Sequence, residues 1–244
     1  MGAVPAKLYS LELSHPGQAA RMMLERKGIE HEVIDLLPGM HPALLRLRGF
    51  RGGTVPALRI DGRRIQGSCE ISRALEEMQP QPHLFPADPD ARRAVEAAEA
   101  WGERELQPIP RRLFRWTLGR NPEFRRQLVE DAGMPVPGLM ARLNIPVIWA
   151  LARAAHADDA TVEADLRGLP ATLDRVDALI ADGVIGGGEP NAADLQIGTT
   201  VRVLLAFEDL RDRVEGRPAA ELARRVLPRY PGPLRLRLPA EWLP

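Results

Sequence analysis

The sequence of 244 residues contains very little cysteine, lysine or aromatic side chain. A single cysteine, Cys69, excludes an intramolecular disulfide and a cysteine-rich metal site, and this usage is typical of the reducing cytosol. Only Lys7 and Lys27 are lysines, so arginine supplies nearly all of the positive charge. The 33 Lys and Arg residues are balanced by 33 Asp and Glu residues. This balance argues against a basic nucleic-acid-binding surface and against a polybasic membrane surface.

Long hydrophobic runs are also missing. The longest apolar stretch, residues 145–152, is far shorter than the about 18 residues that a membrane-spanning helix needs. The first six residues have no basic region followed by an apolar stretch, so no signal peptide is expected. With 45% hydrophobic and 27% charged residues, the composition is that of an ordinary folded protein. We therefore expect a cytoplasmic protein with neither a membrane nor a nucleic acid as partner.

The first part of the chain alternates between strand and helix patterns. We predict strands over residues 7–13, 30–36, 55–60 and 63–66, and helices over residues 16–27, weakly around 44–48, and over 68–78. Asp61-Gly62 between the last two strands predicts a hairpin, because a type I′ turn needs positive φ at both positions. The order βαβ followed by ββα predicts an α/β domain over residues 1–79.

The rest of the chain shows helical patterns only. Residues 79–89 contain four prolines, which predicts a semi-rigid linker at residues 80–90. Helical spacing then recurs over residues 91–106, 122–131, 145–155, 161–181 and 191–210. The proline-rich end, residues 228–244, predicts a tail that wraps the surface without regular structure. The predicted fold class is thus α/β plus all-α, with the helical domain over residues 91–244.

The segment Ser14-His15-Pro16-Gly17 lies between the first strand and the first helix. Ser14 is suited to cap this helix, since its hydroxyl oxygen would accept a backbone N–H bond. The same hydroxyl and the helix N-terminus are equally suited to a bound anion. A Ser14-His15 hydrolase pair is rejected, because sequence neighbours rarely face each other and the Gly-x-Ser-x-Gly elbow is missing.

Two further segments offer backbone groups to a ligand. Pro56 at the start of a strand needs no function, but a cis Val55-Pro56 bond would free the Val55 N–H and C=O for an extended peptide. Ser68 caps a predicted helix, or binds a carboxylate together with the free N–H groups there. Cys69 beside it is interpreted as a half-buried hydrophobic residue rather than a nucleophile.

Asn191 and Asp194 resemble a capping box at the start of an apolar helix, which is a structural interpretation only. The glycines at 186–188 follow no predicted strand and lack the G-x-G-x-x-G spacing, so we do not expect a dinucleotide site.

Taken together, the order and spacing of these segments resemble the soluble glutathione transferase superfamily over nearly the full length. Residues 13–21 are similar to the Ser-x-Pro-Cys-Arg pattern of its theta and delta types, Val55-Pro56 to its Val-Pro, and Gly67-Ser68 with Ile71 to its Glu/Asp-Ser-x-x-Ile motif. The resemblance implies a thioredoxin-like N-terminal domain and a C-terminal helical bundle.

This resemblance also implies a set of site residues. Ser14 is the catalytic residue, whose hydroxyl bonds to the glutathione sulfur. Val55 pairs with the cysteinyl backbone of glutathione, Ser68 holds the γ-glutamyl carboxylate, and His41 contacts the glycyl end. Thr54 and Gly67 occupy glutathione-binding positions where the family often has a lysine and an acidic residue, and Gly17 replaces the usual Cys or Ser. Tyr9, near the end of the first strand, is the reserve partner for the sulfur.

The resemblance implies a glutathione-dependent transferase that uses glutathione as co-substrate and no metal. A small-molecule electrophile would bind between the domains, against residues such as Trp101, Phe114 or Trp116, and the protein would be a homodimer. The departures at residues 17, 54 and 67 motivate an alternative, a non-catalytic binding or interaction protein with the same fold. A thiol-disulfide enzyme is disfavoured, because Ser14 occupies the position of its cysteine and Cys69 has no C-x-x-C partner.

Overall fold

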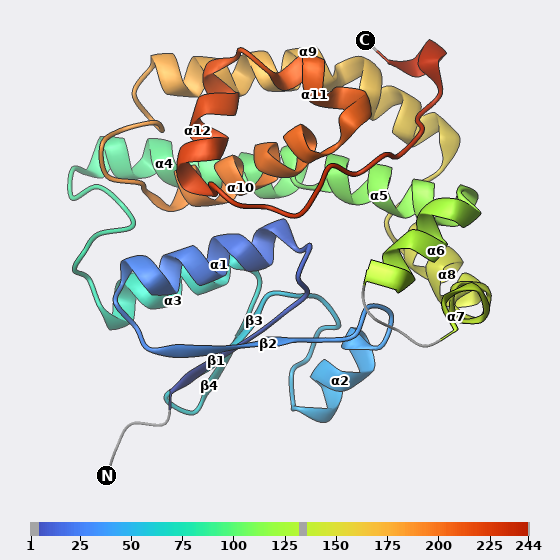
Figure 1. The fold of residues 1–244 in the computed structure, drawn as a ribbon. Coiled ribbons are helices and arrows are strands. Elements are labelled where there is room, and N and C mark those ends of the chain that lie inside the picture. The colour runs from blue at the N-terminus through green and yellow to red at the C-terminus, as the bar shows by residue number, and fades with distance from the viewer. Residues whose placement is uncertain (1–4, 132–135, 244) are drawn as a thin grey trace.

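The computed structural model describes residues 5–131 and 136–243, so the segment searched for a signal peptide lies partly outside the described residues, as does Pro244. Its N-terminal half is built on one four-stranded sheet (Figure 1). The strands are β1 (Ala6–Ser10), β2 (His31–Asp35), β3 (Ala57–Ile60) and β4 (Arg63–Gln66), in the order β2-β1-β3-β4. β1 is parallel to β2 and antiparallel to β3, and β3 is antiparallel to β4. The predicted βαβ-ββα order is confirmed.

Three helices cover this sheet: α1 (His15–Arg26), α2 (His41–Leu47) and α3 (Ser68–Met78). Figure 1 shows α1 and α3 on one face and α2 on the other. Successive side chains of β1 point to opposite faces of the sheet. Leu8 packs in the larger core with α1 and α3, whereas Tyr9 packs with Leu45 of α2. Asp61 and Gly62 have φ values of 47° and 77°, as the predicted hairpin requires.

The remainder of the described chain is helical, as predicted. Its elements are α4 (Pro89–Trp101), a π-helical turn η1 (Gly102–Leu106), α5 (Pro108–Arg120), α6 (Pro122–Asp131), α7 (Pro137–Leu143), α8 (Ile145–Ala154), α9 (Asp159–Ala181), α10 (Ala192–Ala206), α11 (Glu208–Val214), α12 (Pro218–Val226) and a 3₁₀ turn η2 (Ala240–Trp242). The domain limits at residues 79, 80–90 and 91 stay a prediction, because one hydrophobic core contains residues of both halves.

The structure differs from the predictions for the helical half in several places. α5, α7 and α12 were not predicted, and each begins with a proline in its first turn, where a missing N–H costs nothing. The predicted helix over residues 191–210 is interrupted at Phe207, which is extended (ψ 110°), and α11 starts after it. The tail is not confined to the surface, because Leu236 and Leu238 are buried and Leu234 forms a β-bridge with Phe207.

α10 is the central helix of the molecule. Fourteen of its fifteen residues are buried, and it packs against α1, α4 and α12. The predicted capping box starts it, with Asn191 and Asp194 bonded to each other's backbone N–H. Near its middle, Thr200 lies 3.1 Å from Nδ1 of His15, the first residue of α1. The N-terminus of α1 is therefore held against the helical half.

The proline-rich segment after α3 is tied down by Lys27. This side chain is fully buried, and its ammonium donates to Glu76 Oε2 at 2.5 Å and to the carbonyl oxygens of Gln79, Pro80 and Pro82. Burial alone would raise the pKa of Glu76, but the hydrogen bonds from Lys27, the Leu84 N–H and His83 outweigh it and lower that pKa. The linker is therefore fixed by a fully buried charge and its hydrogen bonds.

A second buried ion pair joins α3 to α4. Arg73 donates to the fully buried Glu99 carboxylate, which also accepts a 2.7 Å bond from the Ser72 hydroxyl. Burial raises the pKa of Glu99 to about 7, although Arg73 and Ser72 act in the opposite direction. This carboxyl therefore titrates near neutral pH in the folded protein.

Within the described residues, no helix combines the length and the apolar character that crossing a membrane requires. Over the same residues, no three His, Cys, Asp or Glu side chains are grouped so that they could bind a metal ion.

Replacing Lys27 by Met tests the linker network. We expect a loss of about 3–5 kcal/mol in the free energy of unfolding, because the buried Glu76 carboxylate would lose its counter-charge and three carbonyls would lose their donor. Urea denaturation measures it. Lys7→Met is the matched control, since the only other lysine is exposed and pairs with an exposed Glu32, and we expect at most about 0.5 kcal/mol there. Equal small losses for both variants would contradict the structural role of Lys27.

Glu99→Gln tests the titration of the buried carboxyl. Its pKa is higher in the folded than in the unfolded chain, so its contribution is fully present below about pH 4.5 and is lost as the pH rises through about 7. The wild type should therefore lose up to roughly 3 kcal/mol relative to Glu99→Gln between pH 5 and pH 8. Urea denaturation at four pH values measures this difference. Glu96→Gln on the same helix is the control, and parallel curves for Glu99→Gln and the wild type would disprove the assignment.

Candidate functional site

The strand register brings three of the predicted segments to one end of the sheet. Tyr9 of β1 pairs with Ala57 of β3, and Ala57 also pairs with Gln66 of β4. The loop after β1, the Val55-Pro56 step before β3 and the start of α3 after β4 must therefore lie together. Because neighbouring strands are about 5 Å apart, this edge has the width of a short extended peptide.

Ser14 is the N-cap of α1. Its hydroxyl oxygen accepts a 3.2 Å bond from the Gly17 N–H, and the residue is half-buried. A hydroxyl accepts and donates at once, and no acceptor for the Ser14 proton is found among the described residues. The two interpretations of this serine, as a cap and as a donor to an anion, are therefore compatible.

The loop that carries Ser14 is fixed from both sides. The Tyr230 hydroxyl, from the C-terminal tail, donates a 2.8 Å bond to the Leu13 carbonyl. On the other side, the Thr200 hydroxyl meets the buried His15. Burial, followed by the charge of Arg111, holds the pKa of His15 well below its usual value, so this ring is neutral at pH 7. Tyr230 is a residue that the sequence patterns did not single out.

A steric constraint that the sequence did not reveal explains why residue 17 is a glycine. A Cβ at this position would lie 2.0 Å from the hydroxyl oxygen of the buried Ser10 and 3.2 Å from the Ser14 Cβ. Ser10 therefore occupies the space in which the family's usual Cys or Ser would extend. Ser10, Glu12, Gln18, Arg21 and Asp35 line a hollow of about 200 Å³ there together with Gly17 and Val33.

The Val55-Pro56 bond is cis, as the resemblance implied. Val55 is half-buried, and among the described residues neither its N–H nor its carbonyl has a hydrogen-bond partner. The neighbouring Thr54 is exposed, and its carbonyl accepts a 2.7 Å bond from the Gln66 side chain. Val55 thus offers one donor and one acceptor to an extended chain.

Gly67 and Ser68 start α3. Gly67 has a φ of 105°, which disfavours any side chain, and a Cβ there would lie 2.0 Å from Glu70 Oε2. Ser68 is only 1% exposed, and its hydroxyl accepts a long 3.4 Å bond from the amide of Gln196 on α10. The sequence predicted Ser68 as a carboxylate-binding residue but did not predict Gln196 in front of it.

A glycine lies directly against the Gln196 side chain. Gly102 begins the π-helical turn η1, and a Cβ there would lie 3.0 Å from the Gln196 side-chain oxygen and 3.0 Å from Ile197. π-Helical turns often occur at functional sites because they shift the face that a helix presents. Here the turn separates α4 from α5.

His41 and Tyr9 are both buried. His41 begins α2 and is 6% exposed, and its Nδ1 has no hydrogen-bond partner in the described structure. Burial, followed by the charge of Arg115, lowers its pKa. Tyr9 packs edge-on against Phe50 at 5.6 Å between the ring centroids, on the α2 face of the sheet. Its ring is therefore on the face opposite α1, which favours Ser14 over Tyr9.

Cys69 is half-buried, as predicted. Burial and then the charges of Glu99 and Glu103 raise the pKa of its thiol far above the usual range. The thiolate is the reactive form, so this thiol is unreactive at neutral pH. This finding removes the main support for a thiol-disulfide enzyme.

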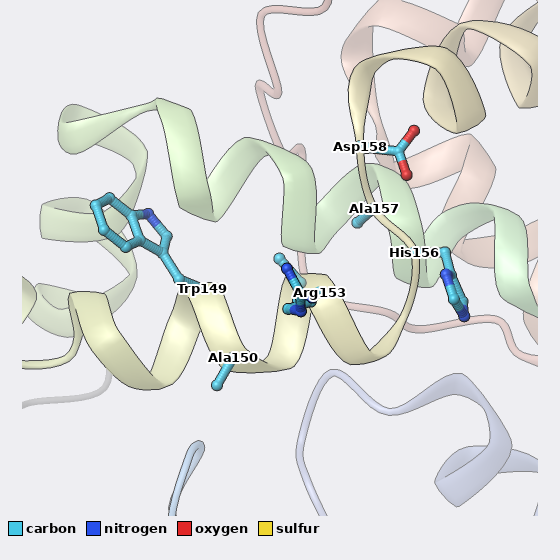
Figure 2. Close-up of a pocket in the computed structure, with 7 residues that line it drawn as sticks. Trp149, Ala150, Arg153, His156, Ala157 and Asp158 are labelled. Carbon is cyan, nitrogen blue, oxygen red and sulfur yellow. The ribbon is translucent and has the colours of Figure 1, made fainter.

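The aromatic residues predicted around an acceptor pocket are mostly in the core. Trp101 and Trp116 are 3% and 7% exposed, and their indole N–H groups donate to Glu105 and Asp159. Phe114 is half-buried and packs edge-on against Phe124. A cavity of about 710 Å³ lies elsewhere, along α8 and the loop after it, where Trp149, Arg153 and His156 border it (Figure 2). None of the predicted glutathione-binding residues lines this cavity.

Comparison with known proteins agrees with this geometry. Residues 8–83 match the family model of the glutathione S-transferase N-terminal domain. No curated protein sequence matches the chain.

Solved structures resemble the chain over nearly its full length. The β-etherase LigF from Sphingobium sp. strain SYK-6 is 20% identical, with a TM-score of 0.63, and the match covers 91% of this chain and 99% of that one. A glutathione S-transferase from Rhodospirillum rubrum F11 is 20% identical (TM-score 0.60, 97% of both chains). A theta class enzyme from Xanthomonas axonopodis pv. citri, with glutathione bound, is 21% identical (TM-score 0.56, 91% of this chain and 97% of that one). Residues 8–83 are therefore a glutathione S-transferase N-terminal domain, and the chain has the fold of solved glutathione S-transferases over nearly its full length.

Proposed function

We propose that this chain is a glutathione-dependent transferase that activates the glutathione thiol for attack on a small electrophile. The observation that carries the proposal is the Ser14 hydroxyl, whose oxygen accepts from the Gly17 N–H while its proton meets no acceptor in the part of the chain that the structure describes. A donor in this state, at the N-terminus of α1, suits a sulfur anion. The glutathione-bound theta class structure of the same fold supports the choice of ligand.

The proposed tripeptide lies along the end of the sheet. Its cysteinyl backbone pairs with the free N–H and carbonyl of Val55. The γ-glutamyl carboxylate takes the position in front of Ser68 that the amide of Gln196 now occupies with a long bond. The glycyl end extends toward His41 and Thr54, at the start of α2 and before β3.

Glu70 compensates for the missing acid at residue 67. The positive φ of Gly67 disfavours a side chain there, and one carboxylate oxygen of Glu70 lies where the Cβ of residue 67 would be. Glu70 is exposed, so its charge is open to a ligand. In the proposal it meets the γ-glutamyl ammonium of glutathione.

Ser14 and the end of α1 suffice for thiol activation. Lowering a thiol pKa from about 8.5 to about 6.5 needs ~2.7 kcal/mol in favour of the charged form. A hydrogen bond to a charged group contributes about 1.5–3 kcal/mol. The helix N-terminus adds about 0.3–1 kcal/mol. Ser14 therefore acts as a donor to the thiolate and not as a base, since a free hydroxyl is far less acidic than a thiol.

The reaction is a nucleophilic substitution or addition at an electrophilic carbon. The thiol proton leaves to solvent, and the sulfur anion forms a C–S bond with the acceptor. In a substitution, the leaving group departs with the electron pair of the broken bond. In an addition, the π bond breaks, and its electron pair moves to the neighbouring atom, which takes a proton from solvent. The free enzyme is regenerated when the thioether conjugate dissociates.

A non-catalytic binding or interaction protein is the second candidate. The observation in its favour is the 1% exposure of Ser68 behind Gln196, which closes one end of the proposed site. A calorimetric titration with glutathione separates the two, because only the first function needs binding at millimolar concentration or below. The homodimer and the cytoplasmic location that the resemblance implied remain predictions.

Ser14→Ala should lower kcat for conjugation of glutathione to 1-chloro-2,4-dinitrobenzene by about 10- to 100-fold at pH 7, because the thiolate loses its donor. The rate should recover as the pH rises toward the free thiol pKa, and glutathione affinity should change little. The pH profile of kcat measures this effect.

The cap role of Ser14 needs its own control. Ser14→Thr keeps both the cap and the donor and should retain most of the rate, whereas Ser14→Ala should cost the fold about 1 kcal/mol. Ser10→Ala is a second control, because it removes a nearby hydroxyl that bonds to the Leu11 carbonyl. An unchanged pH profile in Ser14→Ala would refute the role of Ser14.

Ser68→Ala should weaken glutathione binding by about tenfold, because the γ-glutamyl carboxylate loses a hydrogen bond. Gln196→Ala should leave binding intact or strengthen it, because the long bond that competes for Ser68 is removed. Isothermal titration of both variants measures the two affinities. An unchanged affinity in Ser68→Ala would show that glutathione does not reach this residue.

A further inference from the structure

Three polar residues form one stripe along α5 and at its start. Gln107, Arg111 and Arg115 are spaced four residues apart, so they share one side of the helix. Arg111 is the charge that acts on His15, directly after Ser14, and Arg115 is the charge that acts on His41. The charges of this stripe therefore act on the residue after Ser14 and on the first residue of α2. Figure 1 shows α5 on the side of the helical half that lies nearest the N-terminus of α1.

The two arginines of this stripe differ from their neighbours in lacking a carboxylate. Arg112 pairs with Asp165 and Arg120 with Asp159. Within the described residues, no carboxylate oxygen lies within 4.0 Å of Arg111 or Arg115. Arg111 donates to the Gln107 side-chain oxygen at 2.7 Å, and Arg115 to the Leu151 carbonyl at 3.2 Å.

These charges are partly desolvated and repel each other. Burial, followed by the charge of Arg111, lowers the pKa of Arg115 to about 10. Burial also lowers the pKa of Arg111. Both side chains stay positively charged at neutral pH. The charge of Glu103 opposes the lowering of the Arg111 pKa, but among the described residues no carboxylate forms an ion pair with either guanidinium. Such an arrangement is costly unless a ligand supplies the negative charge.

Among the described residues, two buried polar atoms without a hydrogen-bond partner accompany these arginines. Gln107 is 5% exposed, and the amide group whose oxygen accepts from Arg111 carries an Nε2 with no acceptor. His41, whose pKa responds to Arg115, is 6% exposed and has an unpartnered Nδ1. In native proteins such groups are nearly always satisfied by protein, water or ligand. A planar oxyanion would satisfy the Gln107 amide and both guanidinium groups.

We propose that Arg111, Arg115 and Gln107 form an anion subsite that binds the acid group of the electrophile, so that the chain prefers carboxylate-bearing acceptors. The inference rests on the proposed transferase function and specifies its substrate class. An acceptor is favoured over the glycyl carboxylate of glutathione, because the Arg111 charge acts on the residue after Ser14 and the electrophilic carbon must reach the sulfur there. The reaction is the one given above, with a ring carbon as the centre attacked.

Two probes of nearly equal shape test the subsite. Glutathione displaces chloride from 4-chloro-3-nitrobenzoate and from 4-chloro-3-nitrobenzamide, which differ in charge. In the variant Arg111→Met/Arg115→Met, kcat/KM for the benzoate should fall by about 10- to 100-fold, and that for the benzamide by less than about threefold. Each probe is compared between the wild type and the double variant, so the difference in intrinsic reactivity between the two probes cancels. Arg104→Met, which removes an exposed arginine from η1, is the control and should change neither value.

Binding measurements separate the possible sources of the anion. Isothermal titration with glutathione and with the two glutathione conjugates of these probes needs no turnover. The proposal is supported if the double variant loses its preference for the acid conjugate while glutathione affinity is retained. It is overturned if the preference persists, if the wild type has none, or if glutathione affinity falls to the same extent, because the arginines would then bind the glycyl carboxylate.

If neither glutathione nor either conjugate binds, the proposed function fails, and the subsite is judged separately on the free benzoate and benzamide. Selective binding of the benzoate that disappears in the double variant would support the subsite. Equal binding of the two probes would overturn it. Thermal denaturation verifies that the variants fold.

Discussion

The packing of α1 against α10 is the constraint on which the rest of the structure depends. α1 presents the Ser14 hydroxyl at its N-terminus, and the bond between His15 and Thr200 fixes that end on the most buried helix of the molecule. Gln196, one turn earlier on α10, lies against Ser68 of α3. One helix of the second half therefore positions two of the three segments that form the candidate site.

The charged side chains that are buried between the elements are not all paired. Arg73 and Glu99 neutralise each other between α3 and α4, and Lys27 is neutralised by Glu76 and three carbonyls behind the linker. Arg111 and Arg115 have no such partner among the described residues. Buried charges are generally paired, because desolvation is costly without compensation. The unpaired arginines are thus the feature of the fold that requires an explanation by function rather than by stability.

The departures from the family pattern have local physical causes. Gly17 leaves room for the buried Ser10 hydroxyl, and Gly67 adopts a positive φ that side chains disfavour. In each case another residue occupies the vacated space, Ser10 at the first position and Glu70 at the second. The sequence reveals such replacements only as missing residues, since the compensating side chain is distant from or out of register with the motif.

The sequence by itself determined the order of strands and helices in the N-terminal half, the hairpin at Asp61-Gly62, the α10 capping box and the segments around Ser14, Val55 and Ser68. These features depend on local periodicity, turn geometry and caps, which neighbouring residues encode. Three helices with prolines in their first turn escaped prediction, because tertiary packing outweighs weak local propensity there. Only the tertiary structure decided that Gln196 covers Ser68, that Tyr9 turns away from α1, and that the charges of Arg111 and Arg115 act on His15 and His41. These contacts join residues far apart in the chain, and side-chain burial and pairing arise only when the two halves pack together.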